Sequence, residues 1–437
     1  MRETLAWIAH SGGPLHGTLT IPGDKSISHR AIMLAALADG VSQIDGLLDS
    51  EDTRATETIF NQLQVQIDRP SATTRIIHGV GLFGLHAGAD PLDCGNAGTC
   101  MRLLAGLLAG QRFDSILVGD SSLSRRPMRR VTAPLEQMGA QIATSAAGTS
   151  PLRIQGMRSL QGITYRCEVA SAQVKSAILL AGLFAQGRTC VIEPRPTRDY
   201  TERMLRAFGV DVEISNQAIA LRGQQPLHPL DLQVPGDFSS AAFFIVAASI
   251  IPGSELTLRS VGLHPRRTGL LAALWQMGGH IECSNEREVG GEHIADLRVW
   301  AAPLRGIILP ETLVADMIDE FPIFLIAAAA ASGSTRISGA AELRVKESDR
   351  LAVMAAGLRQ LGIAVEETVD GAIICGGCIG AGTVESHGDH RIAMAFAVAG
   401  QIAQGDVRIN DVANVATSFP QFVAHALSVG CGLNDLR

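Results

Sequence analysis

The feature that most limits what this chain can fold into is a long internal repeat. Six Ala-rich apolar segments of helical length each run to a glycine, and successive terminal glycines lie 66 to 80 residues apart. Because glycine is the usual left-handed residue after a helix, we expect these glycines to end the helices. The segments are 30–40, 101–110, 177–187, 241–253, 324–333 and 391–405.

A second, amphipathic stretch of helical pattern follows each segment after a short β-type run. Six units of helix, strand, helix and strand in 437 residues predict two α/β domains of three units each. The turn-prone Val234-Pro235-Gly236-Asp237 marks the predicted midpoint. The second stretches have related endings, namely Leu63-Gln64-Val65, Met138-Gly139-Ala140, Phe208-Gly209-Val210, Met277-Gly278-Gly279, Leu361-Gly362-Ile363 and, more loosely, Leu427-Ser428-Val429-Gly430.

Charge and hydropathy exclude several classes of function. The formal net charge is −7, so a basic surface for nucleic acid or an acidic membrane is not expected. The start of the sequence lacks the pattern of a secretory signal. The longest apolar stretch, 241–251, is too short for a bilayer, which needs about 20 residues. We therefore expect a cytoplasmic protein that binds neither nucleic acid nor membrane.

The eight cysteines are expected to be reduced and mostly buried. Cys375 and Cys378, followed by His387 and His390, could form a zinc ligand set. Against this, 372–375 has the pattern of a short buried strand, and no second Cys-x-x-Cys occurs. The structural interpretation is favoured, and no metal site is predicted.

Polar residues stand before the first helix of several units, and arginines recur in the turns before the second helices. A helix N-terminus favours anions, and guanidinium groups suit phosphate and carboxylate. Each residue alone could be a helix cap or a solvated charge, but recurrence at one structural position favours an anion site. The cations chosen on this basis are Lys25, Arg126, Arg198, Arg350 and Arg391.

Two carboxylates, Asp319 and Glu347, lie among these cations. A carboxylate beside a bound anionic substrate can transfer protons. Each could equally be a structural ion-pair partner. The sequence thus predicts a cleft that holds two small anionic substrates and that can support acid–base chemistry.

Five motifs between residues 22 and 420 resemble, in order, those of the EPSP synthase (3-phosphoshikimate 1-carboxyvinyltransferase) family. Each motif is modest alone, but the set is specific, and the Ser-Ala-Gln-x-Lys form resembles the bacterial class II branch. The motifs are PGDKSISHR at 22–30, GNAGT at 95–99, SAQVKS at 171–176, LRVKESDR at 343–350 and DHR at 389–391.

The resemblance implies a two-lobed α/β fold of six βαβαββ units, three per lobe, with helix N-termini facing the interlobe cleft. One lobe would comprise residues 1–22 and 238–437 and carry the catalytic carboxylates. The other would comprise 23–237 and carry most of the shikimate 3-phosphate site. The repeat alone would place residues 1–22 with the first half.

The implied reaction is an addition–elimination. The enolpyruvyl group of phosphoenolpyruvate moves to the 5-hydroxyl of shikimate 3-phosphate, giving 5-enolpyruvylshikimate 3-phosphate and phosphate. This transferase step belongs to the shikimate pathway, which leads to chorismate and the aromatic amino acids. The resemblance implies no metal and no organic cofactor, and we expect a monomer.

The resemblance also implies a role for individual residues. Asp319 would accept the proton of the 5-hydroxyl, and Glu347 would act in proton transfer at the methylene carbon. Lys25 is the third residue expected to be catalytic. Shikimate 3-phosphate would contact Lys25, Ser26, Arg30, Ser171, Gln173, Arg198, Asp319 and Lys346. Phosphoenolpyruvate would contact Lys25, Gly98, Arg126, Gln173, Arg350 and Arg391.

The chain departs from the family pattern at two positions. Tyr200 stands where class II relatives often carry His, and Thr417 stands where class I relatives carry a Lys that contacts the leaving phosphate. The contact of that Lys is expected to be absent or supplied by another group, and the contact of that His is not carried over to Tyr200. Gly98 is the small residue of the glyphosate-sensitive pattern, so we expect glyphosate to compete with phosphoenolpyruvate.

Two other functions match parts of the pattern. A UDP-N-acetylglucosamine enolpyruvyltransferase shares the fold, but its mobile loop bears a reactive Cys, and 121–128 contains none. A non-catalytic anion sensor would gain nothing obvious from both Asp319 and Glu347. Enolpyruvyl transfer to shikimate 3-phosphate is therefore the favoured hypothesis.

Overall fold

The chain divides into two compact units, each with its own hydrophobic core. The computed structural model describes residues 5–156 and 159–436. Unit 1 comprises the described parts of Met1–Pro22, Pro235–Glu288 and Glu292–Arg437, and unit 2 those of Gly23–Val234 and Val289–Gly291. The sequence places the boundary at 237/238, three residues later, and the roles that it assigns to the lobes stay predictions.

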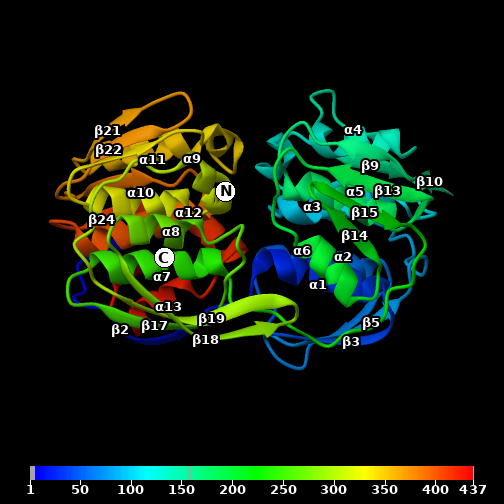
Figure 1. Ribbon diagram of the computed structural model, residues 1–437, viewed down its shortest axis with the longest axis horizontal. Coiled ribbons are helices and arrows are strands. Elements are labelled where there is room, and N and C mark those ends of the chain that lie inside the picture. Colours follow the sequence, from blue (N-terminus) through cyan, green and yellow to red (C-terminus); the bar gives the residue numbers. More distant parts are fainter. Residues whose placement is uncertain (1–4, 157–158, 437) are drawn as a thin grey trace. The chain divides into compact units, whose positions relative to one another are not determined.

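Unit 2 alternates helices and short strands (Figure 1). Its helices are α1 (Lys25–Leu37), α2 (Glu51–Gln62), α3 (Gly98–Ala109), η1 (Leu123–Arg125), α4 (Arg129–Gln137), α5 (Ala172–Gly182) and α6 (Tyr200–Ala207). Its strands are β3 (Asp39–Asp45), β4 (Gln66–Asp68), β5 (Arg75–Val80), β6 (Leu92–Asp93), β7 (Ser115–Val118), β8 (Gln141–Ala143), β9 (Leu152–Gln155), β10 (Leu160–Gln161), β11 (Thr164–Arg166), β12 (Ala185–Gln186), β13 (Arg188–Ile192), β14 (Val212–Ser215), β15 (Ala218–Arg222) and β16 (Leu232–Gln233).

Unit 1 has the same mixture of elements. Its helices are α7 (Phe238–Ile250), α8 (Gly269–Gln276), α9 (Glu311–Val314), η2 (Ala315–Met317), α10 (Phe321–Ala330), η3 (Ala341–Val345), α11 (Arg350–Gln360), α12 (His390–Ala399), η4 (Gly400–Ile402), η5 (Ala413–Thr417) and α13 (Phe422–Ser428). Its strands are β1 (Ala6–His10), β2 (His16–Thr20), β17 (Glu255–Gly262), β18 (His280–Val289), β19 (Glu292–Trp300), β20 (Ser334–Ile337), β21 (Ala364–Glu367), β22 (Ala372–Cys375), β23 (Gly382–Glu385), β24 (Val407–Asn410) and β25 (Gly432–Leu436).

One sheet pattern recurs in both units. The sheets β16-β3-β5-β4, β6-β7-β9-β8 and β11-β13-β15-β14 each have a parallel first pair and two antiparallel pairs. In unit 1 the sheet β23-β24-β1-β25 follows the same pattern. The sheet β2-β17-β19-β18 begins in the same way. In β20-β22-β21 the strands pair antiparallel, and the parallel pairing to β20 is reduced to an isolated bridge between Ile308 and Arg336. The fold class is the predicted α/β, and the division into six βαβαββ units stays a prediction.

The first strand of the chain completes a sheet made from its last strands. β1 lies between β24 and β25, with Trp7 opposite Ile409 on one side and Asp435 on the other. β2 pairs in parallel with β17. Residues 5–22 therefore belong to unit 1, where Trp7 also stacks on Phe422.

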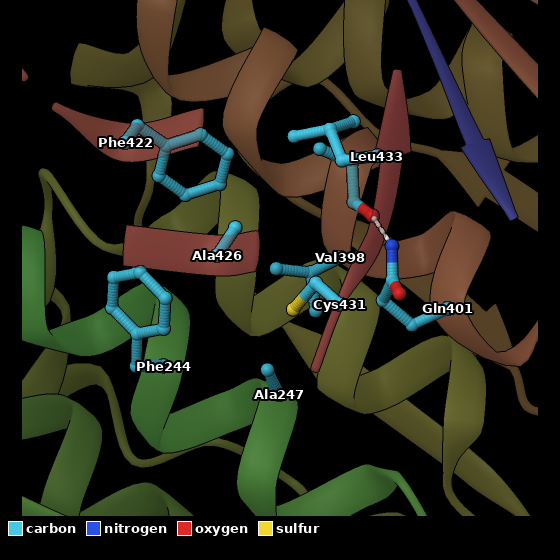
Figure 2. A pocket seen from close by; sticks show the side chains of 9 residues that line it. Phe244, Ala247, Val398, Gln401, Phe422, Ala426, Cys431 and Leu433 are labelled. Atoms are coloured by element: carbon cyan, nitrogen blue, oxygen red, sulfur yellow. Dashed lines mark hydrogen bonds between the residues drawn. The ribbon is translucent and has the colours of Figure 1, made fainter. Parts of the chain in front are cut away.

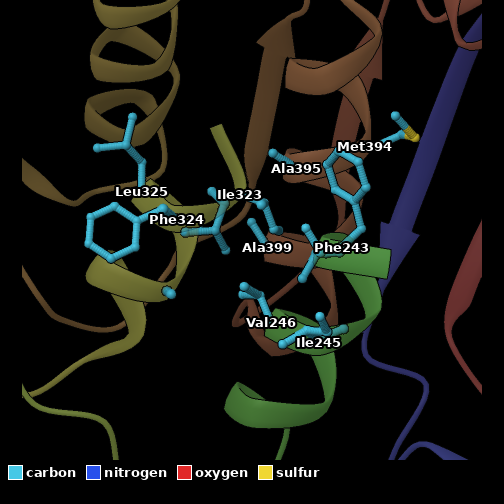
Figure 3. Packing of buried hydrophobic residues seen from close by; sticks show 14 of the residues in the cluster. Phe243, Ile245, Val246, Ile323, Phe324, Leu325, Met394, Ala395 and Ala399 are labelled. Atoms are coloured by element: carbon cyan, nitrogen blue, oxygen red, sulfur yellow. The ribbon is translucent and has the colours of Figure 1, made fainter. Parts of the chain in front are cut away.

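Three apolar helices, α7, α10 and α12, form the centre of unit 1 (Figure 3). Phe243, Ile323 and Ala395 are among the buried side chains that pack there. A helix that is apolar all round, such as α10, is suited to a core rather than to a surface. The residues just before α10 and α12, Glu320 and Asp389, therefore adjoin this core.

The predicted glycine stops are wrong for the first helices. Only Gly110 directly follows its helix, and its φ of −89° is right-handed. The helices α1, α7 and α10 end in the extended residues Ala38, Ile251 and Ala331, because the chain turns directly toward the next strand.

The left-handed stops lie instead at the second helices. The N–H of the residue that follows each stop bonds back to the carbonyl five residues earlier, as Val210 does to Leu205. This is why the related endings recur in the sequence. The left-handed residues are Gln64, Gly139, Gly209, Gly278, Gly362 and Gly430.

Candidate active site

In unit 1, Arg350 lies at the centre of a group of carboxylates. It is the first residue of α11, and its side chain is 1% exposed. Its Nε donates to Asp389 Oδ2 at 2.8 Å, its Nη2 donates to Glu347 Oε2 at 2.6 Å, and its Nη1 lies 3.8 Å from Asp319 Oδ1. Burial alone would lower the pKa of Arg350, but the carboxylates, Asp389 foremost, raise it above its ordinary value. The guanidinium therefore stays charged although it is buried.

Arg391 stands beside this group at the start of α12. The Asp389 side chain caps α12 by accepting from the Arg391 N–H at 3.0 Å. Arg391 Nη1 donates to the backbone oxygen of Asp319 at 2.9 Å. Lys346 precedes Glu347 in the loop between η3 and α11. The structure thus brings Asp319, Glu347, Arg350 and Arg391 close together. The sequence predicts this proximity.

Behind Asp319 lies a buried network that the sequence analysis missed. Glu320 Oε1 accepts from the Ser239 hydroxyl and lies 3.8 Å from Arg267 Nη2 and 3.9 Å from Arg391 Nη1. Arg267 Nη2 also lies 3.1 Å from Asp237 Oδ1. Burial raises the pKa of Glu320 despite the two arginines. The acidic pair at 319–320 in the sequence is the signal that could have found it.

In unit 2, the predicted shikimate 3-phosphate residues Lys25, Ser26 and Arg30 occupy the start of α1. The Asp24 side chain, rather than a serine of the motif, caps this helix by accepting from the Ile27 N–H at 2.9 Å. Lys25 Nζ lies 3.1 Å from Asp52 Oδ2, a partner that sequence reasoning missed.

Arg30 is buried and is held by three hydrogen bonds. Its Nη1 donates to the Ser26 carbonyl at 2.9 Å, its Nε to Thr201 Oγ1 at 2.7 Å, and its Nη2 to Ser176 Oγ at 2.9 Å. Burial and then the charge of Arg198 lower the pKa of Arg30 to about 10. Arg198 thus acts on Arg30 as a like charge.

Arg126 is oriented by a chain of polar side chains. Its Nη2 donates to Asn96 Oδ1 at 2.8 Å, and Asn96 Nδ2 donates to Asp120 Oδ2 at 2.7 Å. Asn96 does not cap α3, because the N-cap residue is Ala97. A Cβ on Gly98 would lie 2.9 Å from Arg126 Nη1, so the absence of a side chain at Gly98 leaves room for the guanidinium.

Ser171 and Gln173 stand at the start of α5. Ser171 caps the helix through the Val174 N–H. Gln173 Oε1 accepts from Arg102 Nη1 at 2.9 Å, and its Nε2 donates to Thr99 Oγ1 at 3.1 Å. Arg102 was missed in the sequence, where its position one helical turn after Gly98 is the available signal.

Tyr200 and Thr417, the two departures from the family pattern, are both buried. Tyr200 is buried at the first position of α6. The Thr417 hydroxyl donates to the Asn414 carbonyl at 2.7 Å, and Asn414 Nδ2 donates to the Gly388 carbonyl beside Asp389. Thr417 therefore supports the loop that carries Asp389.

An apolar cavity in unit 1 is unsuited to anionic ligands (Figure 2). Phe244, Phe422, Cys431 and Leu433 help to line it. Its polar group, the Gln401 amide, is engaged, since Nε2 donates to the Gly432 carbonyl at 3.0 Å and Oε1 accepts from the Gly432 N–H at 2.7 Å. Nothing in this cavity matches the predicted substrates.

The cysteines are free, and Cys375 and Cys378 are exposed, so the burial expected along β22 stops at Ile374. Within residues 5–156 and 159–436, no group of three or more His, Cys, Asp or Glu side chains is placed to hold a metal ion. Over the same residues, no helix is both long enough and apolar enough to span a membrane.

Comparison with known proteins defines the class. The family model for EPSP synthase (3-phosphoshikimate 1-carboxyvinyltransferase) matches residues 9–425. The chain is 67% identical over 432 residues to the 3-phosphoshikimate 1-carboxyvinyltransferase of Xanthomonas campestris pv. campestris strain 8004, covering 99% of each sequence. It is 67% identical over 431 residues to that of Xanthomonas euvesicatoria pv. vesicatoria, covering 99% of the chain and 98% of the relative.

Solved structures similar to this chain support the same family. The EPSP synthase from Acinetobacter baumannii superimposes with a TM-score of 0.90 at 48% identity, covering 99% of this chain and all of that one. The enolpyruvyl transferase NikO from Streptomyces tendae, at 18% identity and a TM-score of 0.80, shares the fold, with 99% of each chain covered. The chain is an enolpyruvyl transferase by class. It belongs to the EPSP synthase family.

The burial of His29 on α1, four residues after Lys25, can be tested through the pH dependence of stability. Its Nδ1 lies 2.7 Å from Thr56 Oγ1, and burial lowers its pKa from 6.5 to about 3. Because the folded pKa is the lower one, protonation favours the unfolded chain, and stability is lost as the pH falls below about 6.5. Each pH unit below that value should remove about 1.4 kcal/mol. His29→Gln should therefore lose less stability than the wild type between pH 7.5 and pH 5 in urea unfolding.

The exposed His86→Gln is the matched control within unit 2 and should keep the wild-type dependence. Equal pH dependence in His29→Gln and the wild type would show that His29 is not held neutral.

Proposed function

We propose that this chain transfers the enolpyruvyl group of phosphoenolpyruvate to the 5-hydroxyl of shikimate 3-phosphate, releasing phosphate. The observation that carries the proposal is the buried Arg350, which contacts both carboxylates chosen for proton transfer, Asp319 and Glu347. Family membership supplies the reaction that such a group would perform. A cytoplasmic location and a monomeric state are further expectations of the resemblance.

Each substrate is proposed to have its own group of contacts, and Lys25 and Gln173 belong to both groups. Shikimate 3-phosphate is proposed to contact Lys25, Ser26, Arg30, Ser171, Gln173, Arg198, Asp319 and Lys346. Phosphoenolpyruvate is proposed to contact Lys25, Gly98, Arg126, Gln173, Arg350 and Arg391. Both substrates are anionic, so fixed cations that need little reorganisation are required to hold them side by side.

The proposed reaction has two stages. In the addition, Asp319 accepts the proton of the 5-hydroxyl, whose oxygen bonds to C2 of phosphoenolpyruvate while the methylene carbon gains a proton. In the elimination, the methyl carbon loses a proton, the bond from C2 to the phosphate oxygen breaks, and phosphate leaves. Glu347 and Lys25 are the groups proposed to move the proton at that carbon.

The reaction is tested directly by phosphate release from phosphoenolpyruvate. Release should require shikimate 3-phosphate, and UDP-N-acetylglucosamine should not replace it. Dependence on the sugar nucleotide would overturn the acceptor, and no release with either acceptor would favour a binding protein.

Asp319→Asn should bind both substrates yet turn over slowly, because an amide cannot accept the hydroxyl proton. We expect kcat to fall by at least about 100-fold with less than about threefold change in either KM. Asp316→Asn, in the adjacent η2 and paired with Arg266, is the matched control and should leave kcat near the wild-type value. A near-wild-type kcat for Asp319→Asn would remove Asp319 from the base role.

Gly98→Ala should disturb Arg126, because the added methyl group would sit 2.9 Å from its Nη1. The KM for phosphoenolpyruvate and the inhibition constant of glyphosate should each rise about tenfold or more, with little change for shikimate 3-phosphate. The control Gly377→Ala meets only Ile363, at 3.8 Å, and should be neutral. A wild-type inhibition constant far above the phosphoenolpyruvate KM would contradict the expected competition.

A further inference from the structure

Lys175 is a buried cation to which the proposed mechanism gives no task. It lies within the SAQVKS motif, two residues after Gln173, in the first half of α5. Its side chain is 1% exposed, so its ammonium group cannot reach a substrate from the surface of the unit. A lysine held this deep requires partners of opposite charge.

Two buried carboxylates supply them. Lys175 Nζ lies 2.8 Å from Glu193 Oε2 and 2.7 Å from Glu202 Oε1, and neither carboxylate is more than 3% exposed. The three residues come from different segments: Lys175 from α5, Glu193 from the turn after β13, and Glu202 from α6. One ammonium group thus joins three segments. Removing it would leave two buried carboxylates facing each other, which is strongly unfavourable.

Each carboxylate is also linked to a substrate cation. On one side, the Thr197 hydroxyl donates to Glu193 Oε1, and Thr197 directly precedes Arg198. On the other side, Thr201 directly precedes Glu202 and accepts from Arg30 Nε at 2.7 Å.

The charges support the same arrangement. Arg198 acts on Arg30 as a like charge and lowers its pKa, whereas Glu202 acts in the opposite direction. Glu202, which Lys175 contacts, therefore offsets part of the repulsion between Arg198 and Arg30.

We propose that Lys175 is a positioning residue for shikimate 3-phosphate, which holds Glu193 and Glu202 and, through them, the substrate cations Arg198 and Arg30. The inference rests on the proposed function, since it takes shikimate 3-phosphate as the ligand of these arginines. It assigns Lys175 no contact with either substrate. Its effect is on the affinity for one of them.

Lys175→Met keeps the length of the side chain and removes its charge. We expect the KM for shikimate 3-phosphate, and its Kd measured by calorimetry without phosphoenolpyruvate, to rise at least about tenfold. The KM for phosphoenolpyruvate and kcat should stay within about threefold of the wild type. Lys175→Arg should restore most of the affinity. Loss of folded protein alone would lower kcat and leave both KM values unchanged, so the split between them separates positioning from bulk stability.

Glu193→Gln keeps the pair of Lys175 with Glu202 and serves if Lys175→Met does not fold. It should raise the shikimate 3-phosphate KM about three- to fivefold. Glu213→Gln breaks the exposed pair with Arg188 in the same sheet and is the control, with no change expected.

The results separate the two proposals. A wild type that releases no phosphate with shikimate 3-phosphate refutes the proposed function. An active wild type with an unchanged shikimate 3-phosphate KM in Lys175→Met, or with both KM values raised equally, refutes the positioning role alone.

Discussion

Each unit must keep cations buried and charged, and the pairing of those cations with carboxylates is the interaction on which the rest of the site depends. Arg350 among Asp389, Glu347 and Asp319 is the example in unit 1, and Lys175 between Glu193 and Glu202 is the example in unit 2. Charges removed from water in this way are expensive unless they are matched closely. The matching fixes side-chain directions before any ligand arrives, and such preorganisation is what a site for anions requires.

Side chains that cap helices fix the backbone beside these ion pairs. Asp24, Ser171, Asp237, Asp349 and Asp389 each cap a helix with their own side chains. At α12 the same aspartate that caps the helix also binds Arg350, so one side chain joins the backbone of one helix to the charge of another. Changing Asp389 would therefore alter a helix start and an ion pair together.

The sequence was sufficient for the fold class, but not for the partners of the charged side chains. The cations and carboxylates of the proposed site were chosen because motifs and repeats mark them along the chain, and their roles stay predictions. Asp52, Arg102 and Glu320 were missed because each contacts a side chain from another segment of the chain, and the weak local signals at Arg102 and Glu320 do not say which segments meet in space. The glycine stops failed for a local reason: Gly40 and Gly253 lie beyond the helix ends, with positive φ in the approach to the next strand. In the second helix of each unit, the left-handed residue does stand at the end of the helix, so the expected left-handed stop occurs there.

The position of β1 between β24 and β25 has a consequence for synthesis of the protein. This strand leaves the ribosome first within unit 1, and its two neighbours leave last. At about 5–20 residues per second, the delay is on the order of tens of seconds. All of unit 2 is translated in that interval and has its own core to fold around. The nascent chain must meanwhile carry Ala6–His10 with both strand edges unpaired, so this sheet can close only after β24 and β25 have been made.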